Sequence, residues 1–130
     1  MFTLQQIEAA AQNVKTGADF PKFIKELKTL GVTRNDVFVM DGMAIYYGHE
    51  NYTVESGAVY ENLLIAQRAS ADALKEALKT HQQGQTDYFT FCKQAAEAGV
   101  EKWITDINVM TVSYLASDGT VLVVEKIPSV

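Results

Sequence analysis

An internal repeat constrains what this chain can fold into more than any other feature of its sequence. Residues 18–34 (ADFPKFIKELKTLGVTR) align without gaps with residues 86–102 (TDYFTFCKQAAEAGVEK). A supersecondary unit that occurs twice predicts two structural copies. We place these pseudo-repeats at about residues 3–47 and 70–115, with connecting strands in residues 48–69. The identical aligned positions are Asp19 and Asp87, Phe23 and Phe91, Lys25 and Lys93, and the pairs Gly31-Val32 and Gly99-Val100.

Each copy has the signals of two helices. Thr3 and Gln6 can form a capping box at the start of the first helix, and Gly17 is placed to accept a left-handed stop. The second copy repeats these signals, so we expect an equivalent pair of helices there. The predicted starts and stops are Ser70 and Gly84 for its first helix, and Asp19 with Gly31 and Asp87 with Gly99 for the second helices of the two copies.

Extended segments follow both helix pairs. In the first copy, VFVM and MAIYY flank Asp41-Gly42 and predict a tight hairpin. In the second copy, WITDI, VMTVSYL and TVLVVEKI read as strands. A chain of 130 residues with 48% hydrophobic content is long enough for one packed core. We therefore predict one α+β domain over residues 1–130, in which tandem duplicated ααββ units form a largely antiparallel sheet with helices packed on one face.

The charge balance and the beginning of the chain exclude several classes of protein. A net charge of −5 produces a field that repels polyphosphates, so nucleic acid is not an expected partner. The start MFTLQQIEAA has no basic segment followed by an apolar run, and no apolar stretch approaches the ~20 residues that span a bilayer. We expect a cytoplasmic protein that binds neither nucleic acid nor membrane.

Cys92 is the only cysteine of the chain and the first candidate for chemistry. The repeat aligns it with Ile24, on the apolar stripe of a helix, and this position predicts a buried packing role. A nucleophilic role would require an electropositive, partly exposed setting with a base nearby. Lys93 is adjacent to Cys92, and His49 or His81 could supply the base, so a small enzyme using Cys92 or His49 is the alternative.

No motif for a metal, cofactor or catalytic triad is present in the sequence. The two histidines share no metal-binding spacing with each other or with Cys92, and the chain has no HExxH, CxxC or EF-hand pattern. Its glycines occur singly at predicted turns and helix ends, so they form no phosphate-binding loop. We therefore predict no catalytic residue, no metal ligand and no cofactor.

The segment IYYGHENY, residues 45–52, is the most informative polar cluster. Alternation along a strand puts Tyr46 and Tyr47 on opposite faces. The second copy has SYLASDG in the equivalent place, so this cluster belongs to one copy only. We name Tyr47, His49 and Tyr60 as candidate ligand- or partner-binding residues, and a turn carrying sheet aromatics is the alternative. A cleft is expected at the seam between the two copies, where their side chains converge.

Four runs of the sequence resemble a known family. They are VKTGADFPKFIKELKTLGVTR, DGMAIYYG, YTVESGAVYE and HQQGQTDYFTFCKQAAEAGVEKW, and together they resemble the YbcV-like bacterial family, a domain of unknown function. The resemblance covers essentially the whole chain. Its members are sometimes labelled phage envelope protein, but the resemblance implies no activity, catalytic residue or cofactor. An acidic chain without an apolar span does not look like an envelope component.

The function that these observations favour is a non-catalytic binding or interaction module. Its partner is expected to be a protein or a small molecule, and the sequence specifies neither the partner nor the oligomeric state. Besides the enzyme, a second alternative is a phage- or stress-associated regulator that acts through protein contacts.

Overall fold

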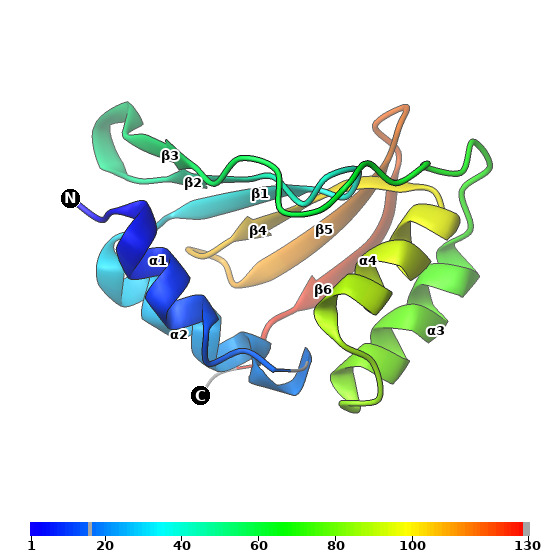
Figure 1. The fold of residues 1–130 in the computed structure, drawn as a ribbon, viewed down its shortest axis with the longest axis horizontal. Helices are drawn as coiled ribbons and strands as arrows, with labels where there is room; N and C mark the ends of the chain where they lie inside the picture. Colours follow the sequence, from blue (N-terminus) through cyan, green and yellow to red (C-terminus); the bar gives the residue numbers. More distant parts are fainter. Residues whose placement is uncertain (16, 129–130) are drawn as a thin grey trace.

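The computed structural model describes residues 1–15 and 17–128 of the chain (Figure 1). It contains four α-helices and six strands among these residues, together with two short 3₁₀ helices. In chain order the elements are α1 (Leu4–Ala11), η1 (Gly17–Asp19), α2 (Phe20–Leu30), β1 (Arg34–Phe38), β2 (Ala44–Tyr47), η2 (His49–Asn51), β3 (Thr53–Glu55), α3 (Ala71–Gln82), α4 (Tyr88–Glu97), β4 (Val100–Asp106), β5 (Thr111–Ala116) and β6 (Val121–Lys126).

All six strands form one antiparallel sheet in the order β3-β2-β1-β4-β5-β6. The central pair joins the two halves of the chain, with Asp36 of β1 opposite Ile104 of β4. Each half runs helix, helix, strand, strand, strand, and the strands of each half lead outward from the central pair. The predicted α+β class with an antiparallel sheet is confirmed. Each helix pair precedes three strands, and the duplication itself stays a prediction.

The helices form two pairs that pack on one face of the sheet. Figure 1 shows α1 and α2 at one end of the sheet and α3 and α4 at the other. Alternation along β4 distinguishes the two faces, because Trp103 and Thr105 are buried while Lys102 and Ile104 are only partly covered. We call these the helix face and the open face of the sheet. The largest fully buried side chains, from both halves, are Ile7, Ile24, Leu27, Leu74, Ile107, Val39, Val100, Thr105 and Cys92.

Most helix ends follow the local signals of the sequence. The capping box of α1 is present, since the Gln6 amide donates to Thr3 Oγ1 at 3.2 Å and the Thr3 amide donates to Gln6 Oε1 at 2.9 Å. The side chains of Ser70 and Asp87 accept from the backbone amides of Ala73 and Thr90 in α3 and α4. The glycines that follow α2, α3 and α4 have positive φ angles, as predicted, and they are Gly31, Gly84 and Gly99.

Three local predictions are wrong in detail. Helix α1 ends at Ala11, well before Gly17, which belongs to η1. Asp19 stands at the start of α2 but makes no capping hydrogen bond to it, because its carboxylate accepts the Lys15 amide at 3.0 Å instead. The β1–β2 connection spans residues 39–43, so it is wider than the predicted two-residue turn.

A long connection links β3 to α3 and crosses from one half of the molecule to the other (Figure 1). Its residue Leu63 donates its backbone amide to the Met40 carbonyl in the β1–β2 turn, at 2.7 Å. Farther along, Ala66 donates to Ala96 in α4 at 2.9 Å. The connection therefore lies against the end of the first hairpin and then against α4.

Candidate ligand-binding cavity

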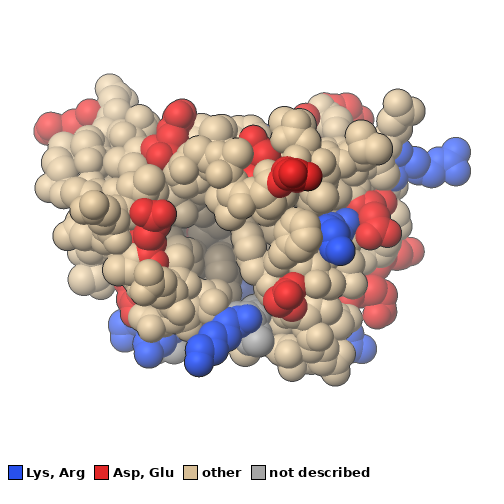
Figure 2. Space-filling view, in the orientation of Figure 1, with Lys and Arg blue, Asp and Glu red and all other residues tan. Residues whose placement is uncertain are grey.

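A cavity of about 810 Å³ lies on the helix face of the sheet, between the two helix pairs. Its lining comes from all four α-helices and from β1, β2, β4, β5 and β6. Figure 2 shows the corresponding hollow in the middle of the surface, between the lobes formed by the two helix pairs. The cavity is thus at the seam between the halves, and both halves build its walls.

Five rings form one side of the cavity, and we call them the aromatic wall. The His81 ring stacks on Phe91, with centroids 4.7 Å apart and planes 15° apart. The rings of Phe91, Tyr114 and Tyr88 surround Trp103 at centroid distances of 5.7, 6.0 and 6.2 Å. These members of the aromatic wall are His81, Tyr88, Phe91, Trp103 and Tyr114, and all of them line the cavity.

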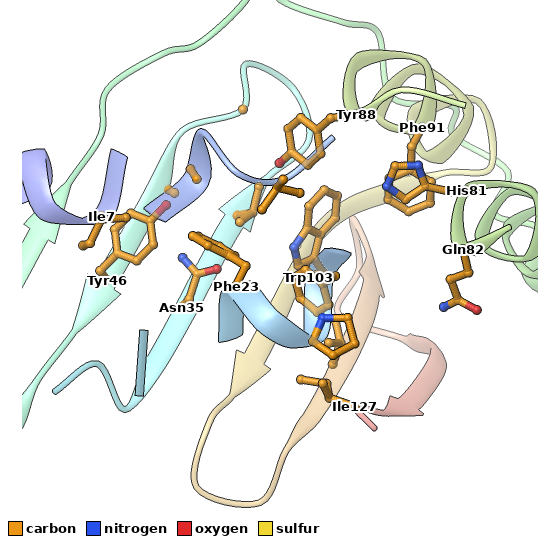
Figure 3. Close-up of a pocket in the computed structure, with 18 of the residues that line it drawn as sticks. Ile7, Phe23, Asn35, Tyr46, His81, Gln82, Tyr88, Phe91, Trp103 and Ile127 are labelled. Atoms are coloured by element: carbon orange, nitrogen blue, oxygen red, sulfur yellow. The ribbon is translucent and has the colours of Figure 1, made fainter. Parts of the chain in front are cut away.

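The opposite side comes from the first half of the chain. Figure 3 shows Ile7, Phe23, Asn35 and Tyr46 across the open space from Tyr88 and Phe91. Asn35 and Tyr46 are opposite one another in the β1–β2 ladder, so both point to the helix face. Burial, together with the negative charge of Glu8, raises the pKa of Tyr46 to about 12, so its hydroxyl stays protonated. This side is apolar with a few hydrogen-bonding groups.

Glu125 places a carboxylate in the cavity lining. It pairs with Val112 in the β5–β6 ladder, and Val112 is a buried residue of the helix face. The Gln82 side-chain amide donates to both oxygens of Glu125, at 3.1 and 3.0 Å, and links α3 to β6. The Tyr114 hydroxyl donates to Glu125 Oε1 at 3.4 Å. Burial and the carboxylate raise the pKa of Tyr114 well above its usual value, so the phenol remains a donor.

His81 contributes a neutral polar group. Burial lowers the pKa of its imidazole from 6.5, against smaller opposing effects of the Thr86 carbonyl and Asp87. His81 Nδ1 lies 3.1 Å from the Thr86 carbonyl oxygen and 3.3 Å from the Thr86 hydroxyl oxygen, so Thr86 fixes the orientation of the ring.

Tyr88 brings a second phenol to the aromatic wall. Its side chain is 42% exposed as a whole, but its hydroxyl points toward the cavity in Figure 3. Burial of this hydroxyl is the main cause that raises the pKa of Tyr88 well above its usual value. The phenol is therefore uncharged at neutral pH.

Tyr47 and His49 lie away from the cavity. Tyr47 points to the open face, where the Arg34 guanidinium carbon is 5.1 Å from its ring centroid. His49 begins η2 and is exposed. The backbone of η2 is irregular, because Glu50 and Asn51 have positive φ angles of 57° and 65°.

Tyr60 lies at the other end of the β1–β2 hairpin. Its hydroxyl donates to the Val39 carbonyl at 2.6 Å, and its ring packs against Gly42, where a β-carbon would stand 2.7 Å from Cε2. Its ring also meets Phe89 edge to face at 5.1 Å. Tyr60 therefore anchors the long connection between β3 and α3 to the β1–β2 turn. The structure does not bring Tyr47, His49 and Tyr60 together, and their contact with a partner stays a prediction.

Cys92 is fully buried behind the aromatic wall and does not line the cavity. Burial raises the pKa of its thiol, while hydrogen bonding with the Tyr60 and Tyr88 hydroxyls acts in the opposite direction. No histidine contributes to this pKa. Within residues 1–15 and 17–128, no three His, Cys, Asp or Glu side chains are grouped as a metal site would require.

The residues of the cavity differ from those named on sequence grounds. Tyr46, Trp103 and Tyr114 occupy inward positions of β2, β4 and β5, and none was a candidate. A sequence signal does exist, since each is a large aromatic within an alternating strand. This pattern alone does not distinguish a binding site from an ordinary core. It indicates a site only when the strand order is known, because the strand order shows which aromatic residues lie together.

Comparison with known proteins identifies the family of this chain. No helix among the described residues is long and apolar enough to cross a membrane. The chain is 25% identical over 116 residues to the uncharacterized protein YcgX of Escherichia coli K12, an alignment covering 89% of this chain and 87% of that protein. The family model for the protein of unknown function DUF1398 matches residues 8–126. The expected YbcV-like label is not confirmed, although a family of unknown function is. The chain therefore belongs to the DUF1398 family.

Proposed function

We propose that this protein is a non-catalytic binding module that takes a small, mainly apolar organic molecule into the cavity between its helix pairs. The observation that carries this proposal is the size and make-up of the cavity, about 810 Å³ lined by both halves. Small-molecule sites are typically clefts of ~300–1,000 Å³ with apolar and aromatic walls and few polar groups. Protein interiors are close-packed and have few voids larger than a water molecule, so a space of this size is not ordinary core packing.

The lining explains the choice of an apolar ligand. Phe23 and Ile7 on one side face the aromatic wall on the other, and Trp103 is the member of that wall nearest to them (Figure 3). Removing ~250 Å² of apolar ligand surface from water contributes roughly 6 kcal/mol before the costs of association. The polar groups, which include the Asn35 amide and the Tyr46 hydroxyl, are suited to orient such a molecule.

Trp103 provides a direct test, because it is the only tryptophan and it lines the cavity. We expect the neutral dye N-phenyl-1-naphthylamine to quench Trp103 fluorescence saturably, with one molecule bound per chain. The variant Ala44→Phe fills the cavity from β2, and Ala11→Phe narrows its mouth from an exposed position on α1. Both should weaken dye binding more than about tenfold.

The matched control is Val124→Phe, because Val124 is 58% exposed and pairs with Ser113 on the open face. Its dye binding should equal that of the unmodified protein. Circular dichroism and thermal unfolding check that each variant is folded. Dye binding that is absent in the unmodified protein, or unchanged in folded Ala11→Phe, contradicts the proposal.

A further inference from the structure

The charged groups that line the cavity indicate which charge its ligand carries. This inference rests on the proposed function. Glu8 and Glu125 line the cavity, one on α1 in the first half and the other on β6 in the second. Figure 2 shows acidic side chains on both sides of the hollow, and basic side chains at its lower end. A ligand held between the halves therefore lies between two carboxylates.

The only cationic side chain in the lining, among the described residues, is Lys126. In the β5–β6 ladder it pairs with Thr111, whereas the neighbouring pair of Glu125 and Val112 points to the helix face. Lys126 is also exposed. Alternation along β6 therefore places the Cβ atom of Lys126 on the other face of the sheet from Glu125, although its long side chain still reaches the cavity lining. His81 adds no positive charge at neutral pH, because its pKa is lowered.

The aromatic wall supplies a second feature that favours positive charge. The faces of phenylalanine, tyrosine and tryptophan rings attract cations by ~0.5–2 kcal/mol each, most strongly where water is excluded. Phe91, Trp103 and Tyr114 lie next to one another with centroid distances of 5.7 and 6.0 Å, and all three line the cavity although each is at most 6% exposed. Glu125 accepts its hydrogen bond from Tyr114, which puts a carboxylate beside these rings.

We infer that the ligand of this cavity is an apolar organic cation, a molecule whose hydrophobic body fills the cavity and whose charged nitrogen or phosphorus centre lies near Glu8, Glu125 and the aromatic wall. A carboxylate or phosphate amphiphile of the same shape would place its charge near the two glutamates and is disfavoured. The net charge of −5 acts in the same direction at long range.

Tetraphenylphosphonium and tetraphenylborate test this inference, because they have nearly the same size and shape and opposite charges. Each is titrated in sodium buffer against the protein carrying N-phenyl-1-naphthylamine, and displacement of the neutral dye is measured. We expect tetraphenylphosphonium to bind at least about tenfold more tightly than tetraphenylborate. Its affinity should fall as salt is raised, while that of the neutral dye should not.

Charge-neutralising variants identify the groups responsible. Glu8→Gln and Glu125→Gln should each weaken tetraphenylphosphonium binding about threefold to tenfold more than they weaken binding of the neutral dye. Glu8→Gln is the safer variant, since Glu8 is exposed whereas Glu125 holds Gln82. The matched control is Glu76→Gln, an exposed glutamate of α3 outside this cavity, which should change neither affinity.

The outcomes separate the two proposals. If the neutral dye binds but tetraphenylborate binds as tightly as tetraphenylphosphonium, the inference is overturned and the proposed function stands. The inference also fails if the cation is preferred and neither glutamate variant weakens it. If neither the dye nor either ion binds, the proposed function fails together with the inference.

Discussion

Cys92 and Ile24 show how a single position is used in the two halves. The repeat aligns them, and both side chains are fully buried on the inner stripe of their helices, α4 and α2. A thiol in this setting is a small apolar group whose raised pKa disfavours the reactive thiolate. Packing therefore accounts for the residue without any catalytic role.

The reactivity of Cys92 tests this interpretation. A thiol reagent should label the native protein at least about a hundredfold more slowly than the protein in denaturant, because labelling requires the core to open. Cys92→Ala should lower the free energy of unfolding by about 1 kcal/mol, and Cys92→Asp by considerably more, since it buries an unpaired charge. Equal labelling rates in the two states would favour the enzyme alternative.

His81 predicts a dependence of stability on pH. Its folded-state pKa lies below 6.5, so the unfolded chain binds a proton more readily than the folded protein. The contribution to stability is complete above pH 6.5 and is lost as the pH falls through the lower folded-state pKa. His81→Phe keeps a ring against Phe91 and removes the titration.

Urea unfolding at pH values between 5 and 8 provides the measurement. The unmodified protein should lose more stability toward pH 5 than His81→Phe does. His49→Gln, at an exposed histidine of η2, is the matched control. If the free energy of unfolding changes with pH equally in the unmodified protein and in His81→Phe, the lowered pKa of His81 is refuted.

At the scale of elements, the junction between α4 and β4 holds the long connection in place. The amides of Ala66 and Ser70 donate to carbonyls at the end of α4, at 2.9 and 2.8 Å. Gly99 turns the chain into β4 with a φ of 86°, and a β-carbon there would stand 2.7 Å from the Cα atom of Ala69. The connection approaches this closely only because position 99 has no side chain.

Gly99→Ala and Gly119→Ala separate the effect of this contact from that of backbone strain. Both glycines have positive φ angles, of 86° and 88°, but a β-carbon at Gly119 would meet nothing within 4 Å. Gly119→Ala should therefore cost about 1 kcal/mol, from strain alone. Gly99→Ala should cost roughly 3 kcal/mol, because backbone must also move. If chemical denaturation shows that both variants lose the same free energy of unfolding, the backbone of the connection can move away from position 99 at no cost.

At the scale of the whole molecule, the cavity depends on both halves being present. Strands β1 and β4 are adjacent in the centre of the sheet, so the helix pair of each half lies at a different end of the sheet. The space between the pairs is the cavity, with Ile7 and Phe23 from one half and Phe91 and Trp103 from the other. Neither half alone contains two opposing walls.

Ligand binding should therefore stabilise the two halves together. At a free concentration of 100 times its Kd, N-phenyl-1-naphthylamine should raise the free energy of unfolding by ~2.7 kcal/mol. Hydrogen exchange should slow in α1 and α2 as well as in α3 and α4. At the same dye concentration Ala11→Phe should show a smaller stabilisation, of about 1.4 kcal/mol or less. Slowing confined to one helix pair would contradict a site built from both halves.

Local features of this protein were determined by its sequence alone. The caps at Thr3 and Ser70 and the left-handed glycines Gly31 and Gly99 were predicted correctly, because they depend on groups within a few residues of each other. The change from helical to alternating periodicity also predicted the α+β class. Asp19 is one of the local exceptions, since its carboxylate accepts a hydrogen bond from the Lys15 amide instead of capping α2.

The tertiary structure alone decided which residues form the site. Alternation predicts that Tyr46 and Tyr47 face opposite ways, but only the packing of the helices makes Tyr46 the one that lines the cavity. Likewise, the pairing of Asp36 with Ile104 joins positions far apart in the chain and brings Trp103 to the centre of the site. Strand order is set by such long-range contacts, whose energy comes from burial in the assembled core and has no signature in a short segment of sequence.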